Sequence, residues 1–209
     1  MFSRSSRART LAGIAAVATL ALTACSDTSS DTDNDAAGDS SESYSIGINQ
    51  LVQHPALDAA AEGFKEAFEE AGVDVEFDEQ NANGEQATAL TISQQFAGAD
   101  LDMVLAVATP AAQATAQNIT DIPVVFTAVT DAESAELVES NDAPGGNVTG
   151  TSDAAPIEDQ LDLLKEIVPD AQSIGIVYAS GEVNSQVQVD AVQEAAGPRD
   201  LEVVTQTVT

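Results

Sequence analysis

Short apolar runs alternate with longer amphipathic segments along the chain from Tyr44 onward. The run Met103–Val107 is apolar at every position, which is typical of parallel strands that are covered on both faces. Segment Pro55–Ala71 instead repeats apolar residues at helical spacing, begins with proline and is followed by Gly72, which indicates a helix. By the same criteria, the pattern predicts strands over residues 44–51, 73–79, 101–108, 122–128, 147–151, 173–179 and 201–208.

The segments between these strands have helical patterns. Helices are predicted over residues 55–71, 85–97, 110–118, 132–138, 156–168 and 184–196, with a turn over 81–84. Regular alternation of strand and helix predicts an α/β fold with parallel, doubly wound sheets. In such folds ligands bind beyond the carboxyl ends of the strands, so polar residues at those ends are the first candidates for a site.

The end of the chain predicts a second lobe that is incomplete. After Thr151 only two helices and two strands remain, and two strands make a poor independent sheet. We therefore expect an N-terminal α/β lobe over residues 44–151 and the start of a second lobe over 152–209, truncated at its C-terminus.

The first 25 residues have the pattern of an export signal. Three arginines precede an apolar stretch from about Leu11 to Leu22, which is too short to span a membrane as a helix of ~20 residues. The tetrapeptide Leu22-Thr23-Ala24-Cys25 resembles the end of bacterial lipoprotein signals. This resemblance implies that Cys25 becomes the first mature residue, carries acyl chains and anchors the protein to the outer face of the cell membrane. An ordinary cleaved signal that happens to contain a cysteine is the alternative.

Residues 26–43 contain small and polar residues with no large apolar side chain. Such a segment buries too little surface to offset the entropy of ordering it, so it is predicted to be a disordered tether. The folded part therefore begins near Tyr44.

The chain is strongly acidic, with 35 Asp and Glu against six Lys and Arg and a formal net charge of −29. Three of the six cations lie in the signal, which leaves Lys65, Lys165 and Arg199. Binding to nucleic acid or to an anionic membrane surface needs basic patches, so neither is expected as a partner.

The residues that catalysis or metal binding would require are scarce. His54 is the only histidine, the only cysteine is Cys25, and the sequence contains neither a Gly-x-Ser-x-Gly elbow nor a phosphate-binding Gly-Lys-Ser/Thr motif. Spacing typical of metal ligands is also missing from the sequence. We therefore expect no enzyme activity, metal or cofactor. His54 is left as a ligand contact, as a helix cap or as a solvated side chain.

Small polar groups follow several predicted strands. Thr109 precedes the helix predicted over 110–118, where its hydroxyl and the first free backbone amides are suited to hold a carboxylate; a plain N-cap is the alternative. No Lys or Arg lies between Lys65 and Lys165, so neutral donors would bind that carboxylate. Asp131 or Asp153 is then available to pair with an ammonium group, which favours a zwitterion over a phosphate.

Four separated segments resemble one protein family: residues 50–58 (QLVQHPALD), 108–113 (ATPAAQ), 125–131 (VFTAVTD) and 144–150 (PGGNVTG). They are similar to the substrate-binding lipoproteins of a bacterial ABC importer family whose members are often described as tryptophan or tyrosine transporters. The resemblance covers about residues 44–209. It implies two lobes of the type I periplasmic-binding-protein fold that close on a small, amino-acid-like ligand, with an ABC permease and its ATPase as partners.

The resemblance also implies roles for particular residues. Thr109 and the amides of Ala111 and Ala112 are expected to bind the carboxylate, and Asp131 or Asp153 the ammonium. The rim or wall of the site is assigned to Gln53, His54, Ala128, Asn184 and Ser185. Phe126 and Tyr178 either line an apolar pocket, where stacking would select an aromatic ligand, or pack in the core. A ligand-binding sensor subunit of the same fold, or a binding protein for another small solute, is the alternative function.

The acidic composition predicts that stability depends on salt. We expect the Tm to rise with ionic strength, because counter-ions screen the repulsion among 35 carboxylates over about 10 Å or less. Thermal unfolding across a salt series measures this effect, and a Tm that stays flat or falls would contradict the prediction.

Overall fold

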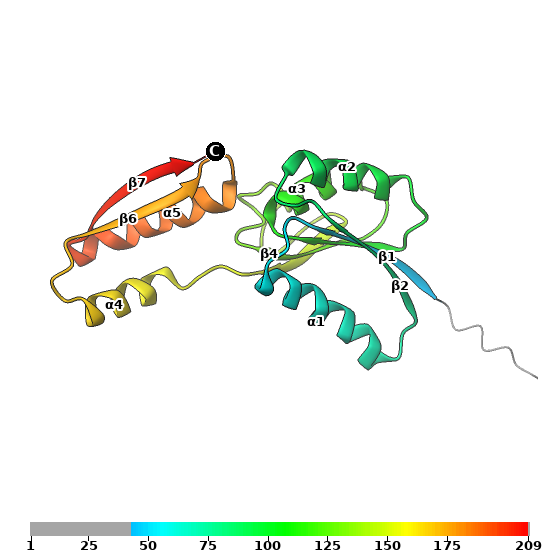
Figure 1. Cartoon of the computed structure of the whole chain (residues 1–209), viewed down its shortest axis with the longest axis horizontal. Helices are drawn as coiled ribbons and strands as arrows, with labels where there is room; N and C mark the ends of the chain where they lie inside the picture. Colours follow the sequence, from blue (N-terminus) through cyan, green and yellow to red (C-terminus); the bar gives the residue numbers. More distant parts are fainter. Residues whose placement is uncertain (1–42, 209) are drawn as a thin grey trace, which may run out of the picture. The chain divides into compact units, whose positions relative to one another are not determined.

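The computed structural model of the chain describes residues 43–208. The predicted signal with Cys25 lies outside this range, as does the predicted tether apart from residue 43. The described elements are, in chain order, β1 (Tyr44–Gln50), α1 (Pro55–Ala71), β2 (Val75–Asn81), α2 (Gln86–Ala97), β3 (Met103–Val107), α3 (Thr109–Asn118), β4 (Val124–Val129), β5 (Val148–Ser152), α4 (Ile157–Ile167), β6 (Ser173–Ala179), α5 (Val183–Ala196), a 3-10 turn (Gly197–Arg199) and β7 (Glu202–Val208) (Figure 1).

The first sheet has five parallel strands in the order β2-β1-β3-β4-β5. The chain leaves β1 through α1 to reach β2, then returns past β1 through α2 to reach β3. The connections that leave β1 and β3 therefore diverge to opposite faces, and in sheets of this order the ligand crevice lies at that switch point. The α/β fold class and the parallel doubly wound sheet predicted from the sequence are confirmed.

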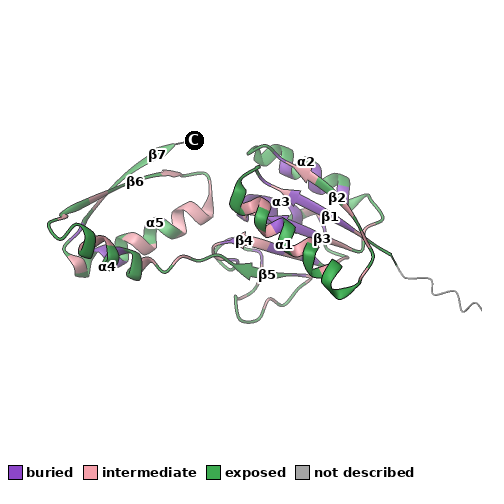
Figure 2. Cartoon of the chain, turned by 60° about the horizontal axis from the view of Figure 1, so that its bottom comes forward, coloured by how far each residue is buried: buried purple, intermediate pink, exposed green. Residues whose placement is uncertain are grey.

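The two faces of this sheet carry separate cores. On one face α1 packs through Ala61 against Ile48, Leu105 and Val107. On the other face α2 and α3 lie side by side over a larger cluster that includes Phe96 (Figure 1). Buried residues concentrate in the strands of this sheet and on the inner sides of its helices (Figure 2). Successive side chains of a strand point to opposite faces of the sheet. A continuous apolar run therefore gives the sheet two apolar faces.

A buried polar cluster lies within the second of these cores. Asn49 of β1 is fully buried, and its Nδ2 lies 3.0 Å from the carbonyl oxygen of Ala89, 3.0 Å from Ser93 Oγ and 3.2 Å from Thr115 Oγ1. These acceptors belong to α2 and α3. One carboxamide therefore holds two neighbouring helices on the central part of the sheet.

The ends of α1 form as the sequence predicts. Pro55 is its first residue, and Gly72 ends it in the left-handed region at φ 69°, with its amide donating to the carbonyl of Glu69 at 3.1 Å. Glycine reaches this conformation without the steric cost that a side chain brings.

The second sheet has two parallel strands, β6 and β7. Helices α4 and α5 pack on one of its faces through Leu161, Ala195 and Ala196, which cluster with Leu201 just before β7. Arg199 connects the two helices, because its Nε lies 2.7 Å from Asp162 Oδ1 and its Nη1 donates to the carbonyl of Ala195 at 2.8 Å.

The opposite face of the second sheet is exposed. Val177 is 70% exposed, and Val204 and Val208 are also exposed. The first sheet ends at Ser152, one residue past the expected boundary between the lobes.

None of the helices in residues 43–208 combines the length and the apolar character that crossing a membrane requires.

Two helix predictions need correction. The helix α3 begins at Thr109 rather than at Pro110, so Ala108 occupies the cap position. The helix predicted over 132–138 is absent, and these residues form turns. Glu136 adopts a left-handed φ of 58°, which interrupts the helical path after a single turn.

The carboxylate of Asp131 organises this turn segment. It accepts hydrogen bonds from Ser134 Oγ at 2.7 Å, Asn141 Nδ2 at 2.9 Å and the amide of Glu133 at 3.1 Å. The hydrogen bond from Asn141, followed by that from Ser134, holds the pKa of Asp131 below its ordinary value.

We predict a pH-dependent loss of stability in Asp131→Asn. A carboxyl group whose pKa is lowered on folding stabilises the protein above its unfolded-state pKa and loses this contribution as pH falls through the lowered folded-state pKa. The variant should therefore have a lower Tm than the parent at pH 7, and the difference should shrink as pH falls below the ordinary aspartate value of 3.8. Exposed Asp142→Asn is the control. An equal Tm for parent and Asp131→Asn at pH 7 would contradict the prediction.

Candidate functional site

The N-terminus of α3 lies at the carboxyl end of β3, beside the switch point of the first sheet. Thr109 is the first residue of this helix and only 2% exposed. Its Oγ1 is buried and has no hydrogen-bond partner within residues 43–208. Buried hydroxyls are normally hydrogen-bonded, since an unpaired one costs about 1–3 kcal/mol. A donor to an anion is therefore available at a helix end whose dipole favours negative charge.

The backbone of α3 supplies two further donors near this hydroxyl, and one of them is the amide of Thr109 itself, which has no backbone acceptor within residues 43–208. Pro110 has no N–H, and the amide of Ala112 already donates to the carbonyl of Ala108 at 3.0 Å. The amide of Ala111 donates to no acceptor in the described part of the chain. Of the two amides assigned to a carboxylate from the sequence, that of Ala111 is free and that of Ala112 is engaged.

The backbone around this end of the sheet adopts rare conformations. Ala108 has φ 82° and ψ 152°, and Ala128 has φ 55°. Ala128 lies where the pairing of β4 with β5 shifts between Phe126 and Val129, and the amide of Ala108 donates to the carbonyl of Thr127 at 3.0 Å. Non-glycine residues with such φ values cost about 1–3 kcal/mol each and cluster at functional sites.

The described cations are all engaged elsewhere. Lys65 Nζ lies 2.6 Å from Glu62 Oε1 and 2.8 Å from Glu79 Oε1. Lys165 Nζ donates to the carbonyl of Ala171 at 2.9 Å, and Arg199 pairs with Asp162. These contacts occupy the cations of residues 43–208, and the expectation that neutral donors bind a carboxylate stays a prediction.

The two acids considered for an ammonium group differ in their surroundings. The carboxylate of Asp131 is engaged by its own loop. Asp153 is exposed, its amide donates to the carbonyl of Val129 at 3.1 Å, and its carboxylate forms no hydrogen bond or ion pair within the described range. Asp153 is thus the freer of the two.

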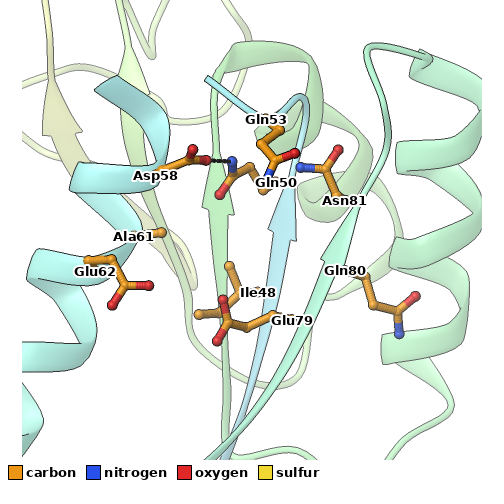
Figure 3. A pocket seen from close by; sticks show the side chains of 9 residues that line it. All are labelled: Ile48, Gln50, Gln53, Asp58, Ala61, Glu62, Glu79, Gln80 and Asn81. Carbon is orange, nitrogen blue, oxygen red and sulfur yellow. Dashed lines mark hydrogen bonds between the residues drawn. The ribbon is translucent and has the colours of Figure 1, made fainter. Parts of the chain in front are cut away.

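Gln53 and His54 follow β1 on the other side of the switch point. His54 is exposed and caps α1, because its Nδ1 accepts the amide of Ala56 at 3.2 Å. Gln53 lines a cavity of about 390 Å³ beside α1 and the carboxyl ends of β1 and β2, together with Asn81 (Figure 3). In this cavity Gln50 Nε2 donates to Asp58 Oδ1 at 2.6 Å (Figure 3).

The candidates in the second lobe lie at the start of α5. Asn184 is its second residue, and its Oδ1 is buried without a hydrogen-bond partner in the described structure. Ser185 lines a cavity of about 430 Å³ together with Tyr178, whose hydroxyl donates to Gln186 Oε1 at 3.2 Å. Phe126 is 5% exposed and belongs to the first core, so it packs as a core residue.

Sequence reasoning missed two features near the site. The buried Asn49 is one, and its signal was a carboxamide directly after the run Ile46-Gly47-Ile48 in β1. The positive φ of Ala108 is the other, and alanine gives no sequence signal for it.

Within residues 43–208 no three His, Cys, Asp or Glu side chains are grouped to hold a metal ion.

Known proteins resemble this chain over most of its length. A tyrosine-binding protein of Clostridioides difficile (strain R20291) is 40% identical over 198 residues, which cover 93% of this chain and 57% of that protein. The chain therefore spans less than two thirds of the length of this curated relative.

Solved structures show the same partial coverage. A conserved domain protein from Vibrio cholerae O1 biovar El Tor and an ABC domain in complex with L-Trp from Streptococcus pneumonia each have a TM-score of 0.78 and 38% identity, covering 80% of this chain and 58% of theirs. The ligand-free, open structure of a substrate-binding protein with adhesive properties from Clostridium difficile has a TM-score of 0.63 and 43% identity, covering 79% of this chain and 58% of that one. Residues 45–209 match the family model described as ABC transporter substrate-binding protein, and the chain belongs to that family.

Proposed function

We propose that this protein is the solute-binding component of an ABC importer and that it binds an aromatic amino acid between its two lobes. The observation that carries this proposal is the set of unpartnered buried atoms. Within residues 43–208 these are Asn49 Oδ1, Thr109 Oγ1 and Asn184 Oδ1. Two of the three belong to residues that the sequence had assigned to the site, and they lie at helix starts in different lobes.

A zwitterion matches the chemistry of these two atoms. The hydroxyl of Thr109 and the amide of Ala111 donate to the ligand carboxylate, supported by the positive end of the α3 dipole. The Oδ1 of Asn184 accepts a hydrogen bond from the ligand ammonium. The free carboxylate of Asp153 compensates the positive charge of that ammonium. Gln53, His54, Ala128 and Ser185 form the wall, while Asp131 shapes the neighbouring loop.

The relatives suggest the class of side chain. One is described as tyrosine-binding, and another was solved in complex with L-Trp, each at about 40% identity to this chain. An aromatic ring supplies large buried area and stacking, which would select it over aliphatic amino acids. The permease and ATPase of an ABC importer are then the partners that receive the ligand.

We also propose that the protein works on the outer face of the cell membrane, anchored through acylated Cys25. The support is the lipoprotein-like sequence Leu22-Thr23-Ala24-Cys25 and the polar segment that follows it. A single acyl chain gives only marginal membrane binding, so stable anchoring implies more than one chain.

Thr109→Val tests the proposed carboxylate site. In the parent, tryptophan, tyrosine or phenylalanine should raise the Tm saturably, because a ligand that binds the native state stabilises it by mass action. Valine keeps the shape of threonine and removes the hydroxyl. Loss of a hydrogen bond to a charged group, worth about 1.5–3 kcal/mol, should weaken the Kd by about tenfold or more.

The stability of the ligand-free variant distinguishes this role from a structural one. Removing an unpartnered buried hydroxyl should leave the Tm unchanged or raise it. Thr91→Val, the same change on the exposed side of α2, is the control and should bind as the parent does. An unchanged affinity in Thr109→Val would refute the assignment, and no saturable shift with any aromatic amino acid in a folded parent would refute the ligand class.

Cys25→Ser tests the proposed anchor. The variant should incorporate no labelled palmitate and should leave the membrane fraction, because the acylated thiol is lost. Ser26→Ala is the neighbouring control. Retention of Cys25→Ser in the membrane fraction would contradict the proposal.

A further inference from the structure

Thr115 is a fully buried polar residue in the second turn of α3. Its Oγ1 donates a hydrogen bond to the carbonyl of Ala111, in the first turn, at 2.8 Å. A hydroxyl has a single hydrogen, so any further partner of Oγ1 must be a donor. Asn49 Nδ2 of β1 is such a donor, at 3.2 Å. The hydrogen bonds therefore run in one direction, from the sheet through Thr115 to the first turn of α3.

The cluster around Thr115 is not explained by stability alone. Asn49 Oδ1 is buried without a hydrogen-bond partner within residues 43–208, which is unfavourable for folding. Replacing buried hydrogen-bonded partners by apolar groups of the same shape can be nearly neutral, so an apolar core would serve stability as well. What buried hydrogen bonds supply in addition is one defined arrangement of the elements that they join.

The first turn of α3 needs such support. Carbonyls of a helix point toward its C-terminus and amides toward its N-terminus, so Thr115 holds Ala111 from the side opposite the free amide. The backbone just before this turn is strained, since Ala108 has φ 82°. Strained conformations persist only where the surrounding structure holds them, and the bond from Thr115 is one such contact.

We propose that Thr115, held by Asn49, is a positioning residue for the ligand carboxylate. It fixes the first turn of α3 so that the hydroxyl of Thr109 and the amide of Ala111 point to the same bound group. This inference rests on the proposed function, because it concerns the same site. Donors that are held in place before the ligand arrives bind it more tightly, because less order has to be imposed on binding.

The chemistry of the proposed donors makes their position important. A hydroxyl and an amide hold the carboxylate in this site, and the cations of residues 43–208 are engaged elsewhere. Attraction between two charges falls slowly with distance, whereas a hydrogen bond weakens steeply when its angle falls below ~120°. A small displacement of the first turn would therefore reduce the affinity for a carboxylate and leave the contacts of the ligand ring and ammonium unchanged.

Calorimetric titration of Thr115→Val with two ligands tests this inference. One ligand is L-tryptophan, L-tyrosine or L-phenylalanine, whichever the parent binds most tightly, and the other is its carboxamide, which lacks the carboxylate. Valine keeps the shape of threonine, and the two hydrogens of Asn49 Nδ2 retain acceptors in α2. The Kd of the amino acid should rise by about fivefold or more, and that of the carboxamide should stay within about twofold.

Two further variants separate this role from a purely structural one. Thr115→Ser keeps the hydroxyl and should keep the parent's preference for the amino acid over the carboxamide. Ser93→Ala removes an equally buried hydroxyl that bonds to the carbonyl of Ala89 in α2, and it should keep that preference even if its Tm falls. If circular dichroism shows that Thr115→Val is unfolded, Thr115→Ala takes its place, because alanine also lacks the hydroxyl and favours a helix.

The preference for the amino acid over the carboxamide decides the outcome. An unchanged preference in Thr115→Val, or an equal loss of affinity for both ligands, would overturn the inference. If Thr109→Val weakens binding of the amino acid and Thr115→Val does not, only the positioning role is wrong. If the parent binds none of the three aromatic amino acids, the proposed function fails and this inference fails with it.

Discussion

The buried carboxamide of Asn49 is the interaction on which the arrangement around the site depends. It lies on β1, an interior strand of the first sheet, and its Nδ2 is within 3.2 Å of acceptors on both α2 and α3. One of these, Thr115 Oγ1, donates in turn to the carbonyl of Ala111 at 2.8 Å, which is in the first turn of α3. The position of that first turn is therefore connected to β1. Leaving any of these buried groups unpaired would cost about 1–3 kcal/mol, so the network resists displacement of either helix.

The elements of this fold follow closely from the sequence, because their signals are local. Pro55 and Gly72 mark the ends of α1, and the strand β6 coincides with its predicted range. The exception is the segment 132–138, where Asp131 provides a capping carboxylate but Glu136 turns left-handed. The helical pattern of this segment corresponds to a single turn in the structure. The segment is also held by a hydrogen bond from Asn141 to Asp131, ten residues apart in the chain, and sequence periodicity within a short window cannot reveal such a contact.

The place of Thr109 in the fold was predictable, and the donors around it were less so. Parallel strands bring their carboxyl ends to one edge, so the sequence could place Thr109 at the edge where ligands of such folds bind, and its role there stays a prediction. It could not tell which backbone amides remain free, because that depends on the residue that caps the helix. With Ala108 at the cap, the carbonyl of Ala108 accepts a hydrogen bond from the amide of Ala112. The amide of Ala111 stays without an acceptor in residues 43–208. A shift of one residue in the helix start thus changes which donors a carboxylate would meet.

The conformations of Ala108 and Ala128 lower the free energy of unfolding, because both have a positive φ. Both are alanines in regions that favour glycine, on adjacent strands joined by the hydrogen bond from Ala108 to Thr127. The conformational preference of a residue usually agrees with the conformation that it adopts. Exceptions concentrate at functional sites, where function requires a conformation that the residue type disfavours. Here that geometry turns the chain sharply from β3 into α3, and the buried hydroxyl of Thr109 has no partner among residues 43–208. Two strained residues and one unpaired hydroxyl at the same sheet edge are each unfavourable for folding alone, and together they support the proposal that a ligand binds there.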